Sequence, residues 1–290
     1  MSRRLTRQQH DKLIKLTFNT GLNVSQYWIY TMELELKDKS KVNQLVTLFR
    51  HLKNLVNEVN INLSDKGMDI NGMDSSHACL IDVNINATWF DKFKAESITL
   101  GVNCEILFKV IDCWKEGQTI TMHTETADEL LIDFEGKSTL DKRFTLPLID
   151  IEADALTIPE LEYQIDLGLK SHDFKELVSE LAIFSESLKL TCIGEQITLL
   201  ANGDMGKMLV EINGEDIIEY AVEEDCDLNI NFGTNYVQQI CSFCKLSSDV
   251  YIHCSSTKPL KFHYSLDDES SNNSKNYVRF FLATQFNDDI

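Results

Sequence analysis

Four neighbouring residues, Asp74, Ser75, Ser76 and His77, carry the side chains of a nucleophilic triad. A triad needs its nucleophile, base and orienting carboxylate to converge from separate parts of the fold. Neighbours in an extended segment cannot easily do this, because successive side chains point to opposite faces. Neither serine stands in a G-x-S-x-G turn, and aspartate and serine favour turns, so the segment predicts a turn before a strand. Two alternatives stay open: a hydrolase that uses Ser75 or Ser76 with His77, and a docking surface.

The other reactive side chains give weaker signals. Cys241 and Cys244 form a C-x-x-C pair, but the pair lies inside a predicted helix and no second pair follows at zinc spacing. This pair therefore indicates core packing. His253 and Cys254 are neighbours on a predicted strand, so their side chains point to opposite faces. Because there is also no phosphate-binding glycine loop and no paired carboxylate site, we predict no catalytic residue, no metal, no cofactor and no enzyme activity.

The chain of 290 residues is acidic, with 27 lysines and arginines, 46 aspartates and glutamates, and a net charge of −19. Such a chain cannot hold nucleic acid by its overall field, so any contact with DNA must use a local basic face or topology. The eight cysteines are scattered and mostly occupy apolar positions, where reduced cysteine behaves as a small hydrophobe, which predicts a reducing compartment. No apolar run approaches the length of a membrane span, so no membrane partner is expected.

Residues 1–31 differ from the rest because they are basic. Five cations stand against Asp11 alone, and 5 − 1 gives a net charge of +4: Arg3, Arg4, Arg7, Lys12 and Lys15. A short basic run is only weak support for a DNA-touching or nuclear-targeting arm. We predict a disordered basic extension for this segment.

The same order of predicted elements occurs twice along the chain. In the first half, apolar residues at helical spacing predict an amphipathic helix from about Asn43 to Asn60. They are Leu45, Phe49, Leu52, Val56 and Val59. Strands are predicted in INL, MDINGMD, ACLIDVNI and SITLGVN, followed by a second helix with Leu107, Val110, Ile111 and Trp114 on one face. The strands TITMHTE and ELLIDFEG complete this half.

The second half repeats this order. YQIDLGLK precedes a helix with Phe174, Leu177, Val178, Leu181 and Phe184 on one face. The strands LKLTCIG, ITLLANG, KMLVEING and LNINFGTN lead to a helix with Val237, Ile240, Cys241 and Cys244, and VYIHCSS and LKFHYSL close the set. The duplication predicts an α+β fold of two similar domains, 32–146 and 164–290, each with antiparallel sheets and two helices. Residues 147–163 are predicted to be an extended connector, because prolines interrupt them.

Four segments, in this order and spacing, resemble the eukaryotic sliding clamp family, proliferating cell nuclear antigen, and its fungal members most. They are GMDSSHACL, LGVN before a helix, DIEADALTIPELEY and the C-terminal VRFFLATQFNDD. The family's first methionine falls near Met32, so residues 1–31 read as an addition or as an error in the assigned start of translation. The resemblance implies a nuclear, non-catalytic DNA clamp fold that assembles as a homotrimeric ring. The alternative is a subunit of a heterotrimeric checkpoint clamp.

The implied ring has its helices inside and its sheets outside. Four predicted helices in each of three chains, at about 9 Å between axes, enclose a circle about 34 Å across and leave about 24 Å free for duplex DNA. The helix faces opposite the apolar stripes offer cations that contact phosphates without reading bases. They are Arg50, Lys53, Lys109, Lys175 and Lys245. This chain has Glu176, Ser179 and Ser242 where the family usually places basic residues, which predicts either weaker pore contact or compensation by Lys245 and the basic N-terminal segment.

The resemblance also assigns GMDSSHACL to a front-face pocket, into which partners insert a plug of one aliphatic and two aromatic residues. Carried over position by position, the pocket is Met73, His77, Ala78, Leu80, Leu156, Ile158, Pro259, Phe281, Ala283 and Phe286. Aromatic anchors dominate affinity in such pockets, and an extended C-terminal tail can pair main chain to main chain with a partner. The implied partners are the replicative DNA polymerase, flap endonuclease, DNA ligase and the clamp loader. Gly194 stands where the family has its modified lysine, which puts that modification in doubt.

Overall fold

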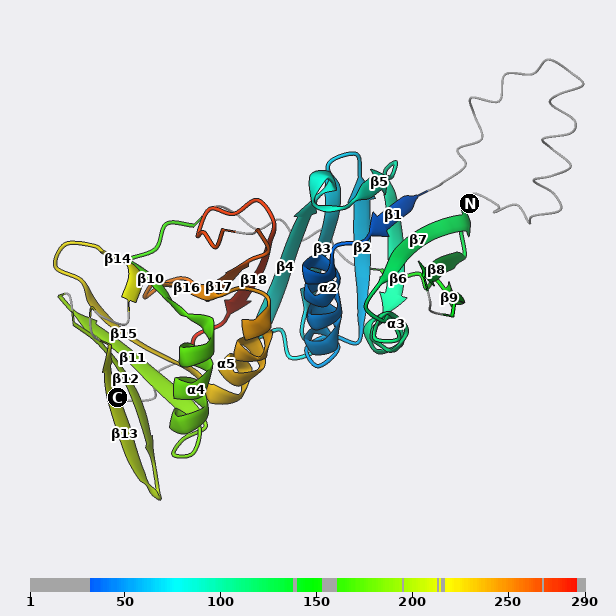
Figure 1. Ribbon diagram of the computed structural model, residues 1–290. Coiled ribbons are helices and arrows are strands. Elements are labelled where there is room, and N and C mark those ends of the chain that lie inside the picture. The colour runs from blue at the N-terminus through cyan, green and yellow to red at the C-terminus, as the bar shows by residue number, and fades with distance from the viewer. Residues whose placement is uncertain are drawn as a thin grey trace, which may run out of the picture.

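The computed structural model describes residues 32–137, 140–152, 161–194, 196–212, 214, 217–267 and 269–285. The predicted basic extension lies outside these ranges. Element labels follow Figure 1. The first half contains β1 (Glu33–Leu36), α2 (Lys39–Leu52), β2 (Glu58–Ser64), β3 (Gly67–Met73), β4 (Cys79–Asn86), the 3-10 helix η2 (Ala87–Trp89), β5 (Lys92–Lys94), β6 (Ile98–Asn103), α3 (Cys104–Ile111), β7 (Gln118–Thr126), β8 (Glu129–Gly136) and β9 (Lys142–Pro147).

The second half repeats this pattern. It contains β10 (Ile165–Lys170), α4 (Ser171–Leu181), β11 (Ser187–Ile193), β12 (Gln196–Gly203), β13 (Gly206–Ile212), β14 (Ile217–Val222), β15 (Asp227–Gly233), α5 (Thr234–Cys241), the 3-10 helix η3 (Ser242–Lys245), β16 (Asp249–Cys254), β17 (Leu260–Ser265) and β18 (Tyr277–Leu282). The predicted fold class, two similar α+β halves with antiparallel sheets and two α-helices each, is confirmed.

The helix α2 begins and ends earlier than the predicted helix from Asn43 to Asn60. Asp38 caps its N-terminus, because the carboxylate accepts a hydrogen bond of 3.0 Å from the Lys41 backbone amide. The helix ends at Leu52, residues 53–57 form a turn, and β2 begins at 58. Val56 and Val59, which lie beyond the helix, are also buried. Their spacing therefore continues the apolar stripe in the sequence, although the helix itself has already ended. The prediction of a helix to residue 60 is wrong.

The other three helices are also shorter than their predicted stripes. Asn103 caps α3 by accepting a hydrogen bond of 3.0 Å from the Ile106 amide, and Trp114 lies beyond the end of that helix. Phe184 follows the end of α4, and Cys244 lies in η3 rather than in α5. In each case a side chain at helical spacing packs on the core from the turn that follows the helix.

The strands form three antiparallel sheets. Their orders are β5-β1-β7-β8-β9, then β14-β10-β16-β17-β18-β4-β3-β2-β6, and β13-β12-β11-β15. The nine-stranded sheet is continuous across both halves, because β18 pairs with β4 (Figure 1). Residues Tyr277–Leu282, predicted as part of an extended tail, are therefore a central strand of this sheet.

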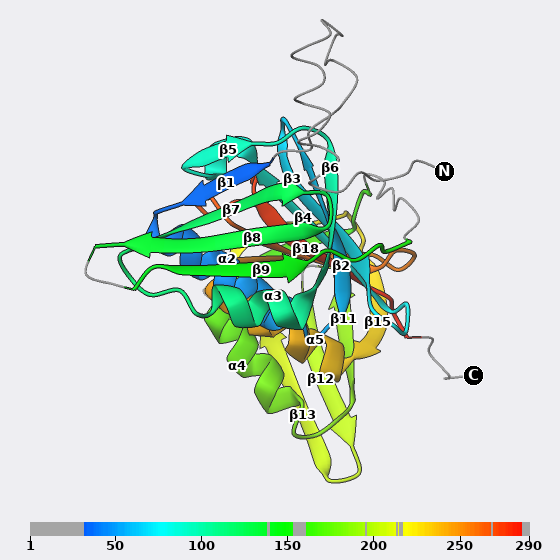
Figure 2. The same ribbon diagram turned by 90° about the vertical axis from the view of Figure 1, so that its right-hand side faces the viewer.

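The helices cover one face of the nine-stranded sheet. The ring of Phe280 lies 4.8 Å from that of Phe243 in η3, and the Tyr264 hydroxyl donates to the Ile240 carbonyl of α5 at 3.2 Å. The helix α2 packs beside α3 and α4 beside α5, and η3 contacts both α2 and α4. Figure 2 shows the β12–β13 hairpin projecting beyond α4. We call the opposite face of the nine-stranded sheet the outer face.

Candidate functional site

The Asp74 carboxylate organises the turn between β3 and β4. Its Oδ1 accepts hydrogen bonds from the backbone amides of Ala78 and Cys79 at 2.7 and 2.6 Å, and its Oδ2 accepts one from Ser76 at 2.9 Å. The Tyr236 hydroxyl of α5 donates to the same Oδ2 at 2.9 Å. Burial alone would raise the pKa of Asp74, but these hydrogen bonds outweigh it and hold the pKa below its ordinary value. The turn is thus built around an ionised carboxylate.

His77 stands at the tip of this turn rather than beside a nucleophile. Its φ of 57° lies in the left-handed region, its amide donates to the Asp74 carbonyl at 3.0 Å, and its side chain is exposed. The Asp74 carboxylate is occupied by backbone amides and Tyr236, so it does not orient the imidazole. The arrangement gives no support to a hydrolase built on Ser75 or Ser76, whereas an exposed histidine suits the rim of a docking surface.

Three of the predicted pocket residues form one row on the outer face. Met73 of β3 pairs with Leu80 of β4, and Leu80 pairs with Phe281 of β18. Because successive strand residues point to opposite faces, these three point away from the helices, while Cys79 and Phe280 enter the core. Met73 and Leu80 are half-buried, and Phe281 is 9% exposed. The row can form the apolar floor of a binding site.

The chain that follows β18 crosses the Asp74 turn. The Ala283 amide donates to the Ala78 carbonyl at 2.8 Å, and the Gln285 amide donates to the Asn231 carbonyl of β15 at 2.7 Å. Continuing the β17–β18 register beyond its last pair puts Pro259 opposite Ala283, and both are exposed. The structure therefore brings Ala78, Ala283 and Pro259 together at one end of the apolar row.

The described ends of the predicted connector are fastened on opposite sides of this row. The Ile149 amide donates to the Gly101 carbonyl of β6 at 3.0 Å, and a side chain at Gly101 would meet the Ile149 carbonyl oxygen at 2.0 Å. At the other end, the Gln164 amide donates to the Cys254 carbonyl of β16 at 3.0 Å. Three predicted pocket residues lie outside the described residues: Leu156, Ile158 and Phe286.

The five predicted cations lie on the helix side in two groups. In the first, Arg50 pairs with Asp112 at 2.8 Å, and Lys109 pairs at 2.8 Å with a glutamate one turn away on α3. The Lys53 ammonium and the Arg50 guanidinium lie 5.1 and 5.6 Å from the ring centroid of Phe108. Two of these cations are therefore partly neutralised by neighbouring carboxylates.

The second group, Lys175 of α4 and Lys245 of η3, gathers near His51 at the end of α2. Burial, together with the positive charges of Arg50, Lys175 and Lys245, lowers the pKa of His51 to about 4. The His51 ring also packs 5.4 Å from that of Phe243. Because cations from three elements act on one imidazole, the two groups belong to one positive surface. The sequence pattern did not single out His51 as a part of this surface.

Other reactive groups form no site in the described part of the chain. There, no group of three or more His, Cys, Asp and Glu side chains is placed to hold a metal ion. Cys241 and Cys244 are 1% and 8% exposed, which confirms the prediction of core packing, and all eight cysteines are free thiols, of which Cys113 is exposed. Among the described helices, none is long and apolar enough to cross a membrane.

Comparisons with known proteins match nearly the whole chain to one family. Residues 31–156 match the family model "Proliferating cell nuclear antigen, N-terminal domain", and residues 157–284 match the C-terminal domain model. The chain is 29% identical over 267 residues to the proliferating cell nuclear antigen of Chaetomium thermophilum, covering 89% of this chain and 99% of that protein. The protein of the same name from Saccharomyces cerevisiae is 29% identical over 266 residues, covering 89% of this chain and 99% of its own length.

A more distant relative and a solved structure extend this likeness. The "DNA polymerase sliding clamp" of Thermococcus gammatolerans is 27% identical over 229 residues, covering 78% of this chain and 90% of that protein. The crystal structure of the proliferating cellular nuclear antigen from Entamoeba histolytica superposes with a TM-score of 0.77 at 22% identity. It covers 88% of this chain and 99% of that chain, which shows that the two have the same fold.

Proposed function

This chain belongs to the proliferating cell nuclear antigen family, and on that premise we propose that it is the processivity clamp of a replicative DNA polymerase. Three copies form a ring of six domains, residues 32–146 and 164–290 of each chain joined by 147–163, around duplex DNA in the nucleus. The ring stays on DNA because it is closed, so a chain of net charge −19 needs no tight contact with phosphates. In this role it catalyses no reaction and needs no cofactor.

A pair of sheet edges at opposite ends of the molecule carries this proposal. Within the described residues, β9 and β13 each pair with one strand only, and Figure 1 places them at the two ends. Such an edge presents unpaired main-chain groups that can pair with another strand. Two different edges that meet head to tail generate a ring when the rotation closes. Pairing of β9 of one copy with β13 of the next therefore supports a closed homotrimer.

The helix side supplies the surface for DNA. We assign phosphate contacts to the two groups of cations described above: Arg50, Lys53, Lys109, Lys175 and Lys245. Lys53 directly follows α2, and the others lie on α2, α3, α4 and η3, so in a ring they would line the pore from both domains. Because two of them are paired with carboxylates, the pore attracts DNA only mildly, which suits a clamp that slides.

The outer face supplies the docking site. We assign the partner's apolar plug to the row of Met73, Leu80 and Phe281, with His77 on the rim. The remaining members of this site are Ala78, Leu156, Ile158, Pro259, Ala283 and Phe286. The partners are the replicative DNA polymerase, flap endonuclease, DNA ligase and the clamp loader, each through a short apolar–aromatic motif.

The native mass of the purified chain, measured by light scattering, tests the ring directly. Three copies of 33.2 kDa give 3 × 33.2 = 99.6 kDa, and that mass is the expected result. A mass of one chain that persists at high concentration would contradict the homotrimer. It would favour the alternative, a subunit of a heterotrimeric checkpoint clamp that needs sister chains to close.

A further inference from the structure

The apolar row on the outer face continues into charged residues on the next three strands. Phe281 of β18 pairs with Lys261 of β17, Lys261 pairs with His253 of β16, and His253 pairs with Asp166 of β10. All lie on the outer face, because the alternate residues of β17, such as Phe262, are in the core. The change from apolar to charged side chains therefore falls between Phe281 and Lys261.

Lys261 is placed as a half-buried cation beside this apolar floor. Its Nζ lies 5.8 Å from the ring centroid of Tyr163, at the described end of the connector. Burial, together with the positive charge of Arg279, lowers the pKa of Lys261 to about 8, although Asp166 and Asp82 act in the opposite direction. The ammonium therefore lacks part of its hydration, and the charges around it compensate for this loss only in small part.

The neighbouring acids make their closest contacts elsewhere. Asp166 Oδ1 lies 2.5 Å from His253 Nδ1, and Asp82 is influenced by Arg279 and accepts a hydrogen bond from Tyr277. Among the described residues, no carboxylate lies within 4.0 Å of the Lys261 ammonium. Within the described residues, Lys261 is therefore a cation beside the apolar row that has no carboxylate partner.

We propose that Lys261 is a specificity-determining residue of the docking site and that it recognises a carboxylate next to the partner's apolar–aromatic plug. This inference rests on the docking site assigned above. A carboxylate would form a charge-assisted hydrogen bond with the ammonium. A partner with only apolar or amide side chains there would cover the cation without pairing it, which disfavours binding. Discrimination of this kind arises as much from the unpaired charge as from the new contact.

The test uses pairs of fluorescently labelled synthetic peptides and the full chain in its native assembly. Every peptide carries the plug of one aliphatic and two aromatic residues, and the two members of each pair have glutamate or glutamine at one flanking position, which is varied from pair to pair. Anisotropy titrations should show a preference of about tenfold for glutamate at one flanking position. The Lys261→Met variant should lose this preference and bind the glutamine peptide as tightly as wild type or tighter. Lys189→Met, the same exchange at a half-buried lysine of β11, should keep it.

The pH dependence of the peptide preference is a second test. The glutamate preference should fall as the pH rises from 7 to 10, because Lys261 loses its proton, and the glutamine peptide should not weaken in parallel. The groups that face Lys261 are Arg279, Asp82, Asp166, His253, His263 and Tyr163. If wild type binds glutamate and glutamine peptides equally at every flanking position, the inference about Lys261 is overturned while the docking site stands. If no peptide binds the intact trimer, the docking assignment itself is wrong and this inference falls with it.

Discussion

Tyr236 on α5 and Asp74 in the β3–β4 turn are 162 positions apart, and the tyrosine hydroxyl donates to the carboxylate at 2.9 Å. This contact joins the docking turn of the first half to a helix of the second half. The carboxylate also receives three backbone amides from its own turn. One buried acid therefore shapes the turn that carries His77 and fastens it to the helix layer.

The first prediction concerns this carboxylate. Asp74→Ala would leave three buried or half-buried amides without an acceptor, and we expect it to lower the free energy of unfolding by about 3 kcal/mol. Urea denaturation measures the change, and a plug peptide should bind the variant less tightly because the turn is no longer held. Tyr236→Phe removes one donor of four and should lower the stability by only about 1 kcal/mol.

Asp65→Ala, in the exposed β2–β3 turn, is the matched control for this pair and should leave both stability and peptide binding unchanged. Wild-type stability and wild-type peptide affinity in Asp74→Ala would show that the turn does not depend on its carboxylate.

The second prediction uses the depressed pKa of His51. An unfolded chain binds a proton at this residue near its ordinary value of 6.5, whereas the folded chain does so only near 4. The contribution of His51 to stability is therefore complete above about pH 6.5 and is lost as the pH falls toward about 4. Between these pH values the wild-type chain loses stability in part because His51 takes up one proton on unfolding. His51→Gln should remove that part of the loss. Urea midpoints at pH 7.5 and pH 5 measure it.

His172→Gln, the same exchange at an exposed position of α4, is the control for this measurement. An identical pH dependence in wild type and His51→Gln would mean that the positive surface does not act on this imidazole in the folded chain.

The third prediction concerns the helix-side cations. Lys53→Glu with Lys109→Glu places six new negative charges in a trimeric pore, and we expect clamp loading onto primed circular DNA to fall about tenfold at 150 mM salt. Polymerase processivity on the same template should fall with it. Lys66→Glu with Lys94→Glu changes charge by the same amount at exposed positions in the β2–β3 turn and in β5 and should load as wild type. Unimpaired loading of the Lys53 and Lys109 variant would exclude these residues from the pore.

Local pattern was enough to predict most elements of this fold. The strand β4 alternates buried and half-buried residues along its whole length, as the sequence of Cys79–Asn86 does, and each α-helix carries an apolar stripe that faces the sheet. The family resemblance, drawn from four short segments, is confirmed by the matches over residues 31–156 and 157–284. Helix ends were less predictable, because side chains such as Trp114 continue the spacing after the backbone has turned.

Pairing between distant segments could not be read from the sequence. The strands β1, β5, β9 and β14 are short or lie at sheet edges, where alternation is too brief to stand out. β18 pairs with β4 across the two halves, and no local signal near Tyr236 names Asp74 as its partner. Lys261 reads as an ordinary strand lysine until the register aligns it with Phe281.

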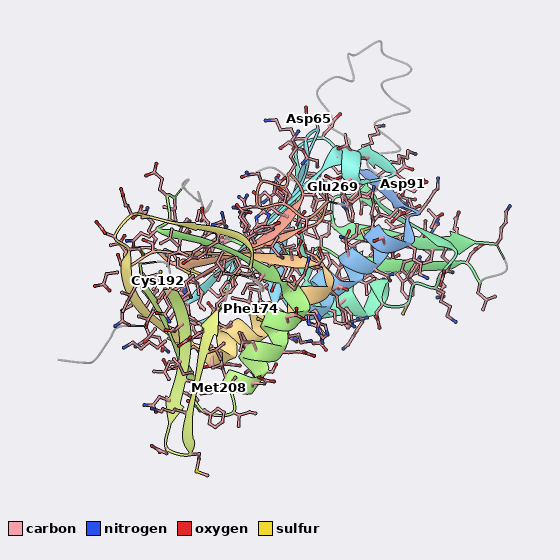
Figure 3. All side chains as sticks on the ribbon, turned by 60° about the vertical axis from the view of Figure 1, so that its left-hand side comes forward. Asp65, Asp91, Phe174, Cys192, Met208 and Glu269 are labelled. Atoms are coloured by element: carbon pink, nitrogen blue, oxygen red, sulfur yellow. The ribbon has the colours of Figure 1, made fainter. Side chains whose placement is uncertain are left out.

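The last prediction tests the proposed closure through β13. Leu209 on this strand is 58% exposed, next to Met208, which Figure 3 places on the hairpin that projects from the molecule. In a closed ring, pairing with β9 of the next copy would bury Leu209, so Leu209→Lys should weaken each interface by about 2 kcal/mol, or roughly thirtyfold in dissociation constant. Light scattering over a dilution series should then show the trimer dissociating at higher concentration than wild type.

The control is Ile193→Lys, because Ile193 is also apolar and is 67% exposed on β11. This variant should keep the trimer, because β11 pairs with strands on both sides. Equal dissociation of both variants would place the interface elsewhere than on the β13 edge.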